Sequence, residues 1–327
     1  MKLLFTADWH IKLGQKNVPI DWAKNRYDKL FHQICDLAAS EKVDLLIIGG
    51  DIFDKLPSLE ELELYFDFIF RASHLKCDTI IYSGNHEALK KNTTFLSNLK
   101  DITYQIGTMS NEKSRIHIFD DFGHFAGIDF IPYNKLKEYH PADIDMHGDI
   151  LCTHVRGEIP PHVKPEVPLE LFDRWKVVLA GDLHSNDNSQ RNILYPGSPL
   201  TTSFHRNSVD TGVLIGDTTT LDFRFVKLKL PQLIRKTIKA GEPMPQTDYD
   251  HTIYEVEGDM SELSNLESST LLDKKVVKRE TDTTLILDPQ MSIRHEVEEY
   301  LKYILSLSDN TVIEILKEFN NHEIISE

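Results

Sequence analysis

Short apolar runs recur along the N-terminal part of this chain, and a polar cluster follows each of them. The runs cover residues 3–5, 45–48, 79–82, 150–152 and 177–180. Runs of this length that are bounded by turn residues predict buried strands. Because ligands of open α/β sheets bind beyond the carboxyl ends of the strands, the polar residues after the runs are the first candidates for a functional site.

Helical spacing occurs between the predicted strands. Residues 25–39 place apolar side chains at the i, i+3, i+4 and i+7 spacing of an amphipathic helix, and residues 44–48 follow as a strand in a buried sheet. Ser58 and Glu61 form a capping box that opens a second helix, which continues to about Ala72. This helix is apolar on several sides, so we expect one face to meet the core and the other to meet either a partner surface or more of the chain itself.

The pattern changes after Asp222. Residues 221–230 alternate like a last strand, residues 239–250 are rich in glycine, proline and charge, and short strands are predicted at 252–257 and 283–287. From Met291 helical spacing returns as two apolar stripes with a break at residues 306–310. The first stripe comprises Met291, Val297, Tyr300, Leu301, Ile304 and Leu305, and the second comprises Val312, Ile313, Ile315, Leu316 and Phe319. We therefore expect three parts, residues 1–228, 229–288 and 289–327.

Composition is that of an ordinary globular protein. The chain has 327 residues, of which 40% are hydrophobic and 27% charged, and this length predicts two or three domains. Its three cysteines show no Cys-x-x-Cys spacing, which argues against a disulfide framework and a zinc ribbon. The sequence shows no signal-peptide pattern and no apolar run of the roughly 18 residues that a membrane span needs, so we expect a cytosolic protein without a membrane partner.

The net charge of −16 argues against nucleic-acid binding by bulk electrostatics, because phosphates are neutralised by lysine and arginine. Two local basic groups nevertheless follow the predicted catalytic part. They comprise Lys227, Lys229, Arg235, Lys236 and Lys239, and then Lys274, Lys275, Lys278 and Arg279. These groups form either a solvated surface or a face that follows the phosphates of a nucleic acid.

The polar clusters carry carboxylate, imidazole and amide side chains. They are Asp8-Trp9-His10, Gly50-Asp51-Ile52-Phe53-Asp54, Gly84-Asn85-His86-Glu87, Thr153-His154 and Gly181-Asp182-Leu183-His184. Such ligands suit Mn, Fe or Zn, and two ions about 3.5–4 Å apart can clamp both the attacking and the leaving oxygen of a phosphoryl displacement. One Asp-x-His would be weak support, but five clusters in this order predict a two-metal site.

The spacing suggests individual roles. Asp51 is expected to bridge the ions, because Gly49 and Gly50 let the backbone turn sharply at the strand end and expose the carboxylate. If their segment is extended, Asp8 and His10 face the same ion.

Asn85, His86 and Asp54 carry separate expectations. Asn85 would supply a neutral oxygen to the second ion, while His86, the next residue, would point elsewhere and remain free as an acid. Asp54 either orients a ligand or caps the helix that follows.

The order of these clusters resembles the calcineurin-like metallophosphoesterase superfamily. Within it, residues 49–54 and the Tyr-Pro-Gly-Ser-Pro-Leu run at 195–200, followed by Ser203 and Phe204, resemble the SbcD branch. That branch contains the nuclease subunit of bacterial SbcCD, its eukaryotic double-strand-break repair counterpart and phage recombination endonuclease subunits. The resemblance is dense over residues 1–205 and thin afterwards, and the compact length is typical of the phage members.

The resemblance implies an α/β fold. Residues 1–228 would form a two-layer β-sandwich flanked by helices, residues 229–288 a small α+β capping domain that guides DNA, and residues 289–327 a C-terminal helix pair. Family members dimerise through helices in the region of residues 58–72, which implies a homodimer. The helix pair resembles the segment that grips the coiled coil of an SbcC-type ATPase, and packing onto the chain's own core is the alternative.

The resemblance also assigns the site residues. It places Asp8, His10, Asp51 and His184 around one metal, and Asp51, Asn85, His154 and Asp182 around the other. His86 becomes the catalytic acid, with Asp54 beside it. The family usually reads Gly-His-x-His where this chain has Asp182 in place of the first histidine, and an extra carboxylate favours Mn or Mg.

The function implied is a Mn-dependent DNA exonuclease or endonuclease subunit of an SbcCD-type complex, placed in the host cytoplasm if the chain is encoded by a phage. A small-molecule phosphodiesterase or phosphoprotein phosphatase on the same site is the alternative enzyme. A non-catalytic subunit that recruits the ATPase is a third reading, and the retained ligands and His86 weigh against it. The chain contains no Gly-x-x-x-x-Gly-Lys loop, so any ATP dependence must come from a partner.

Overall fold

The computed structural model describes residues 1–90, 93–109, 114–141, 146–277, 291–305 and 307–323. The chain forms two units, residues 1–256 with 267–274, and residues 257–266 with 275–327, which are described separately. The first unit contains every residue of the predicted two-metal site.

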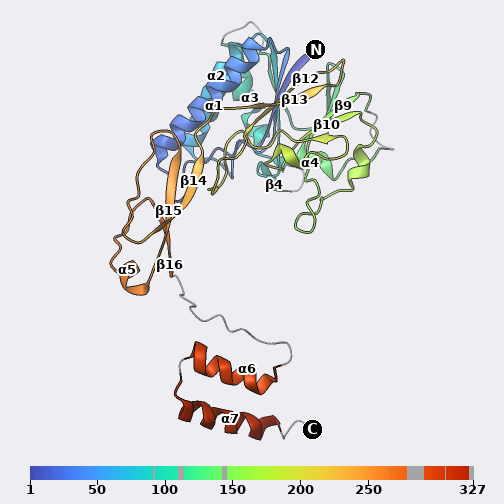
Figure 1. Ribbon diagram of the computed structural model, residues 1–327. Helices are drawn as coiled ribbons and strands as arrows, with labels where there is room; N and C mark the ends of the chain where they lie inside the picture. Colours follow the sequence, from blue (N-terminus) through green and yellow to red (C-terminus); the bar gives the residue numbers. More distant parts are fainter. Residues whose placement is uncertain (91–92, 110–113, 142–145, 278–290, 306, 324–327) are drawn as a thin grey trace. The chain divides into compact units, whose positions relative to one another are not determined.

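Two sheets form the centre of the first unit (Figure 1). One has the order β13-β12-β1-β2-β3-β6 and comprises β1 (Lys2–Thr6), β2 (Leu45–Gly49), β3 (Asp78–Tyr82), β6 (Ile116–Phe119), β12 (Gly212–Asp217) and β13 (Phe223–Lys227). The other has the order β11-β10-β9-β8-β7 and comprises β7 (Gly123–Phe125), β8 (Ile128–Ile131), β9 (Ile150–His154), β10 (Val177–Gly181) and β11 (Ile193–Leu194). The five strands predicted from the apolar runs are β1, β2, β3, β9 and β10.

Parallel pairing places the strand ends that matter at common edges. In the first sheet β1, β2, β3 and β6 run parallel, while β12 and β13 are antiparallel additions. In the second sheet β8, β9, β10 and β11 run parallel. The segments after β1, β2, β3, β9 and β10 therefore leave their sheets at carboxyl edges, where open α/β sheets bind ligands.

The core lies in three layers because the parallel strands are buried on both faces. Phe5, Ile47 and Tyr82 of the first sheet face Phe130 and Leu179 of the second, and all five are fully buried. Alternate residues of the first sheet pack against helices α1 (Ile20–Ser40), α2 (Leu59–Ser73) and α3 (Leu96–Thr108). The outer face of the second sheet is covered by α4 (Tyr133–Leu136), η1 (Leu169–Phe172) and Trp175. This arrangement confirms the predicted two-layer sandwich.

Helix α1 begins earlier than predicted, directly after Pro19, whose backbone is extended. Helix α2 has the predicted capping box, with Ser58 and Glu61 reciprocally hydrogen-bonded. Its apolar residues largely face the chain's own core, where Tyr65 is fully buried and Phe66 partly so. Leu59 and Phe70 remain exposed, so only a small part of the helix is left for a partner.

The chain also contains smaller elements. They are the ribbon β4 (Ala88–Lys90) with β5 (Thr93–Thr94), the turn η2 (Asn186–Asn188), and a three-stranded sheet of β14 (Leu233–Lys239), β15 (His251–Gly258) and β16 (Leu272–Val277). Strand β15 confirms the strand predicted at 252–257. Strands β14 and β16 were not predicted, because their basic residues resemble a solvated surface. The strand predicted at 283–287 lies outside the described residues.

The second unit contains α5 (Met260–Ser264), α6 (Ile293–Glu299), the π-helical turn η3 (Tyr300–Ile304) and α7 (Asp309–Glu323). The two predicted apolar stripes meet here, since Leu301, Val312 and Leu316 are buried together and Val297 and Leu307 pack against them. Among the residues that the structure describes, no helix combines the length and apolar character needed to cross a membrane.

Candidate active site

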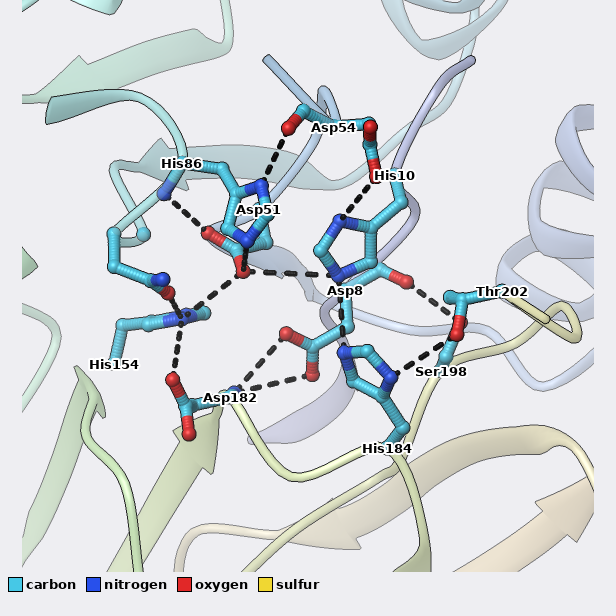
Figure 2. A network of polar contacts seen from close by, with 12 residues as sticks. Asp8, His10, Asp51, Asp54, His86, His154, Asp182, His184, Ser198 and Thr202 are labelled. Atoms are coloured by element: carbon cyan, nitrogen blue, oxygen red, sulfur yellow. Dashed lines mark hydrogen bonds and ion pairs between the residues drawn. The ribbon is translucent and has the colours of Figure 1, made fainter. Parts of the chain in front are cut away.

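All nine residues predicted for the site converge at the carboxyl edges of the two sheets, and Figure 2 labels all of them except Asn85. Three groups have ligand atoms within 4.8 Å of one another: Asp8 with His10 and His184, His10 with Asp54 and His86, and Asp8 with Asp51 and His154. Asn85 and Asp182 border the same cluster through His154 Nε2, at 2.9 and 4.0 Å.

Asp51 occupies the centre of the cluster. Its Oδ2 lies 3.5 Å from His154 Nε2, 3.7 Å from His10 Nε2 and 3.8 Å from His86 Nε2. The carboxylate is almost completely buried. A carboxylate that faces imidazoles from both sides has the position that a bridging ligand requires, and the bridging role itself stays a prediction.

The backbone reaches this arrangement differently from the prediction. The segment after β1 is not extended, because Asp8 and His10 have φ values of 57° and 46° in the left-handed region. Their amides donate to the carbonyls of Gly50 and Asp51, at 3.0 and 2.9 Å, and fold the segment against the loop after β2. Left-handed non-glycine residues are strained and cluster at functional sites, where the surrounding structure holds them.

The two glycines before Asp51 have different tasks. Gly50 has φ +88°, and a Cβ there would lie 2.5 Å from Gly84 N, so it makes the sharp turn that the sequence predicted. The φ angle of Gly49 does not lie in the left-handed region, but a Cβ at that position would meet the Phe5 ring at 2.6 Å. Only Gly50 therefore turns the chain, and Gly49 provides room between the sheets.

The donor chemistry fits divalent cations. His10 Nε2 and His184 Nε2 lie 3.0 Å apart, and burial lowers the pKa of His10 to about 3, so this imidazole is neutral and offers a lone pair. The Asn85 amide group lies beside Asp51 Oδ2 and His154 Nε2, at 3.1 and 2.9 Å. Imidazole, carboxylate and amide groups that converge in this way are the ligand types that divalent metal ions bind.

The order and geometry of these residues agree with the family comparison. Residues 1–210 match the calcineurin-like phosphoesterase family. The chain belongs to that family. The "Probable exonuclease subunit 1" of Escherichia phage T5 is 41% identical over 325 residues, covering 97% of each chain. A protein of Rhodobacter capsulatus that is named as a subunit of the nuclease SbcCD is 29% identical over 115 residues, covering 34% of this chain and 27% of that protein.

Charge in this phosphoesterase is concentrated on the Asp51–His154 pair. Burial opposes ionisation of Asp51, but His154 outweighs it and holds the pKa of Asp51 below its usual range. Burial likewise opposes protonation of His154, yet the carboxylates of Asp51 and Asp8 raise its pKa well above the usual value. The His154 Nδ1 atom donates to the Gly49 carbonyl at 2.9 Å, which directs Nε2 into the cluster.

His86 lies at the edge of the cluster rather than away from it. Its Nδ1 is 2.5 Å from the backbone oxygen of Asp54, and its ring meets the His10 ring at a centroid distance of 4.7 Å. The Nε2 atom faces Asp51 and the side chain is partly exposed. A proton donor held in this way can reach a substrate oxygen.

Asp54 does not cap the following helix, whose N-cap is Ser58. Its carboxylate pairs with Lys12 Nζ at 2.8 Å and lies 3.9 Å from His10 Nδ1. The other expectation for Asp54, that it orients a ligand, is the one that the contacts favour. Lys12 was not among the predicted residues.

Asp182 faces His154 but is also paired with Arg156. The guanidinium donates from Nε and Nη2 to both Asp182 oxygens, at 3.0 and 3.1 Å. Burial and the Asp182 charge also raise the pKa of the nearby Glu166. Sequence reasoning missed Arg156, although its place two residues after His154 could have drawn attention to it.

Glu87 was noted in its motif without a role. It is fully buried and accepts hydrogen bonds from the amides of Asp51, Phe53 and Gly84, at 2.9, 3.1 and 2.8 Å. It therefore ties the loop after β3 to the loop after β2. The signal in the sequence was the position of this acidic residue directly after His86 in the same motif.

The loop at residues 195–200 and Thr202 just after it contact residues of the cluster. Ser198 Oγ donates to the Asp8 carbonyl at 2.6 Å, and Thr202 Oγ1 lies 3.1 Å from His184 Nδ1 (Figure 2). His184 and Thr202 also line a cavity of about 560 Å³, together with Asn186 and His205. This cavity opens space for a ligand directly beside the candidate metal ligands.

Proposed function

We propose that this phosphoesterase is a Mn-dependent DNA nuclease subunit that hydrolyses phosphodiester bonds at a two-metal site. The observation that carries the proposal is the convergence of imidazole, carboxylate and amide donors on Asp51. The similarity over nearly the whole chain to a protein named as a phage exonuclease subunit supports DNA as the substrate.

The proposed ligand sets are those expected from the sequence. Asp8, His10, Asp51 and His184 would hold one ion, and Asp51, Asn85, His154 and Asp182 the other. Bound ions would supply an activated water and stabilise developing negative charge. Asp8, Asp51, Asn85 and Asp182 offer hard oxygen donors, which favour Mn or Mg over softer metals.

His86 is proposed as the acid that protonates the leaving oxygen, with Asp54 as its positioning residue. The Asp54 carbonyl accepts from His86 Nδ1, so the exchangeable proton is carried by Nε2, which faces the cluster. The cavity beside His184 offers room for a nucleotide next to the reacting bond.

The test is cleavage of end-labelled duplex and single-stranded oligonucleotides by the metal-stripped chain after addition of Mn²⁺, Mg²⁺ or Zn²⁺. We expect cleavage that depends on the added metal and is strongest with Mn²⁺. Absence of DNA cleavage, combined with hydrolysis of a cyclic nucleotide or a phosphopeptide, would instead establish the small-molecule phosphodiesterase or phosphatase alternative.

We further propose that the C-terminal helix pair binds a coiled-coil ATPase of the SbcC type in the host cytoplasm. Two relatives are named as subunits, which supports a partner. Leu301, Val312 and Leu316 hold the two helices together, while Tyr303 and Ile313 are exposed. The exposed apolar side chains are suited to helix-in-groove recognition.

The homodimer is also a proposal. Leu59 and Phe70 are the apolar residues of α2 that the described part of the chain leaves exposed, and a symmetric contact would use them. Sedimentation of the chain with both residues changed to serine tests this assignment, since a mass equal to that of the native chain would contradict it.

A further inference from the structure

Arg156 is hydrogen-bonded to Asp182, which borders the candidate metal cluster. It follows His154 by two residues, just beyond the end of β9, and its guanidinium donates to both oxygens of Asp182. Asp182 Oδ1 lies 4.0 Å from His154 Nε2. The cation is therefore held one side chain away from the predicted second ion position.

The two partners of this pair differ in exposure. The Asp182 side chain is 5% exposed, whereas the Arg156 side chain is 42% exposed. In the part of the chain that the structure describes, both hydrogen bonds from the Arg156 guanidinium go to Asp182. Its remaining N–H donors are available to an incoming group.

An anionic substrate needs such a group here. The chain carries a net charge of −16, and four of its carboxylates, Asp8, Asp51, Asp54 and Asp182, lie in or beside the cluster. Lys12, another cation at the site, is paired with Asp54. Figure 2 shows Asp54 and Asp182 on opposite sides of Asp51, so Arg156 supplies positive charge on the His154 side.

We infer that Arg156 binds a non-bridging oxygen of the substrate phosphodiester, with Asp182 holding the guanidinium in position. The inference rests on the proposed phosphodiesterase function and names a substrate-binding residue for it. Arginine suits this task because its planar fork keeps N–H donors for a phosphate oxygen while one edge is bound to a carboxylate.

A purely structural counter-ion for Asp182 is the competing explanation. A counter-ion would affect stability or metal binding, whereas a substrate-binding group affects KM and the affinity for DNA. The two explanations are therefore separated by measuring metal binding and substrate binding on the same variants.

The experiment compares the full-length chain with Arg156→Ala and Arg156→Lys. KM and kcat are measured for bis(p-nitrophenyl) phosphate with Mn²⁺, and Mn²⁺ binding is measured by calorimetry. Affinity for a fluorescein-labelled single-stranded oligonucleotide with phosphorothioate linkages is measured by anisotropy over a range of salt concentrations. Arg191→Ala is the matched control, because Arg191 is 39% exposed and similarly bound to Asp173, away from the cluster.

We expect Arg156→Ala to raise KM and the oligonucleotide Kd roughly 10- to 100-fold, as for loss of a hydrogen bond to a charged group. The slope of log K against log salt should fall by about 1. Mn²⁺ affinity should stay within about twofold, Arg156→Lys should be intermediate, and Arg191→Ala should match the native chain.

A KM and Kd within twofold of the native values in Arg156→Ala would overturn the inference. If Arg156→Ala loses Mn²⁺ or fails to fold, Arg156→Lys decides: a raised KM supports substrate binding and a native KM refutes it. Hydrolysis of the small diester without cleavage of DNA would refute the nuclease proposal alone, and the KM of the diester would still decide the role of Arg156.

Discussion

Glu87 and Asp51 are joined by a hydrogen bond of 2.9 Å from the Asp51 amide to Glu87 Oε2, inside a buried part of the site. The same carboxylate accepts the amides of Gly84 and Phe53. The central carboxylate of the cluster is thus positioned by a second carboxylate, which takes no part in the predicted ligand sets. The backbone of Asp51 is placed by Glu87, and its side chain faces the histidines.

Glu87→Gln should therefore destabilise both the fold and the site. The amide group cannot accept all three N–H groups, and a buried donor left without a partner costs about 1–3 kcal/mol in the free energy of unfolding. We expect a lower midpoint in urea unfolding and weaker Mn²⁺ binding in calorimetry. Glu170→Gln, at an exposed ion pair with Arg191, is the control. A native unfolding midpoint and native Mn²⁺ affinity in Glu87→Gln would contradict the positioning role.

Asp51→Ala should abolish binding of both ions, because this carboxylate alone is predicted to contact both.

His86→Asn should retain both ions and lose most of the turnover, since general acid assistance is typically worth about 10²–10⁴-fold. Calorimetry with Mn²⁺ and the rate on labelled DNA check the two variants together. Full two-ion occupancy in Asp51→Ala, or unchanged Mn²⁺-dependent cleavage by His86→Asn, would remove the respective assignment.

Asp182→Ala should weaken the second ion selectively, while Asp182→His should retain activity and change the preferred metal. The physical reason is that an imidazole replaces a carboxylate as ligand and leaves Arg156 without its anionic partner. Metal titrations of the native chain and of both variants provide the measurement. Identical titrations of the native chain and Asp182→Ala would show that Arg156 is the sole partner of this carboxylate.

Glu255 should make the chain sensitive to acid. It is buried between Lys274, at 2.9 Å, and Arg206, at 2.7 Å. The ion pair with Lys274, aided by the Arg206 charge, holds the pKa of Glu255 below its usual 4.5. Because the folded-state pKa is depressed, this stabilisation is present above about pH 4.5 and is lost as the pH falls through the folded-state value.

Urea unfolding at a series of pH values checks this prediction. The difference in the free energy of unfolding between the native chain and Glu255→Gln should be largest at neutral pH and should shrink below about pH 4.5. The exposed Glu170→Gln variant should show a much smaller dependence on pH. A constant difference across the series would mean that Glu255 stabilises the fold through its shape rather than its charge.

A chain ended after Asp288 should keep its fold and its Mn²⁺-dependent activity on simple substrates, and should lose ATPase binding. Ile313→Glu with Tyr303→Glu should mimic the truncation, because these side chains are exposed apolar groups of the helix pair. Changes at Leu301 and Leu316 would instead separate the helices, since both are buried between them. Retention of the ATPase by the truncated chain in a pull-down would refute the assignment, and unfolding of the catalytic unit on truncation would favour packing onto the chain's own core.

Much of the site was predictable because its residues belong to local motifs that follow apolar runs. Each run predicts a buried strand from a few adjacent residues, and parallel strands bring their carboxyl ends to a shared edge. The grouping of His10 with His184 came from the family resemblance, and the structure places their Nε2 atoms 3.0 Å apart. Reasoning from apolar runs failed for β14, because its basic residues made a strand resemble a solvated surface.

The sequence by itself determined where the strands β1, β2, β3, β9 and β10 lie along the chain, the residues at their ends and the chemistry of the donors, because these depend on residue type and local spacing. Only the tertiary structure decided the left-handed backbone at Asp8 and His10, the burial of Glu87 between two loops and the pairing of Arg156 with Asp182. Those features depend on hydrogen bonds between segments that are far apart in the chain. The packing of the two sheets sets the free-energy cost of the left-handed backbone and the orientation of the buried and paired side chains. Local spacing in the sequence does not specify that packing.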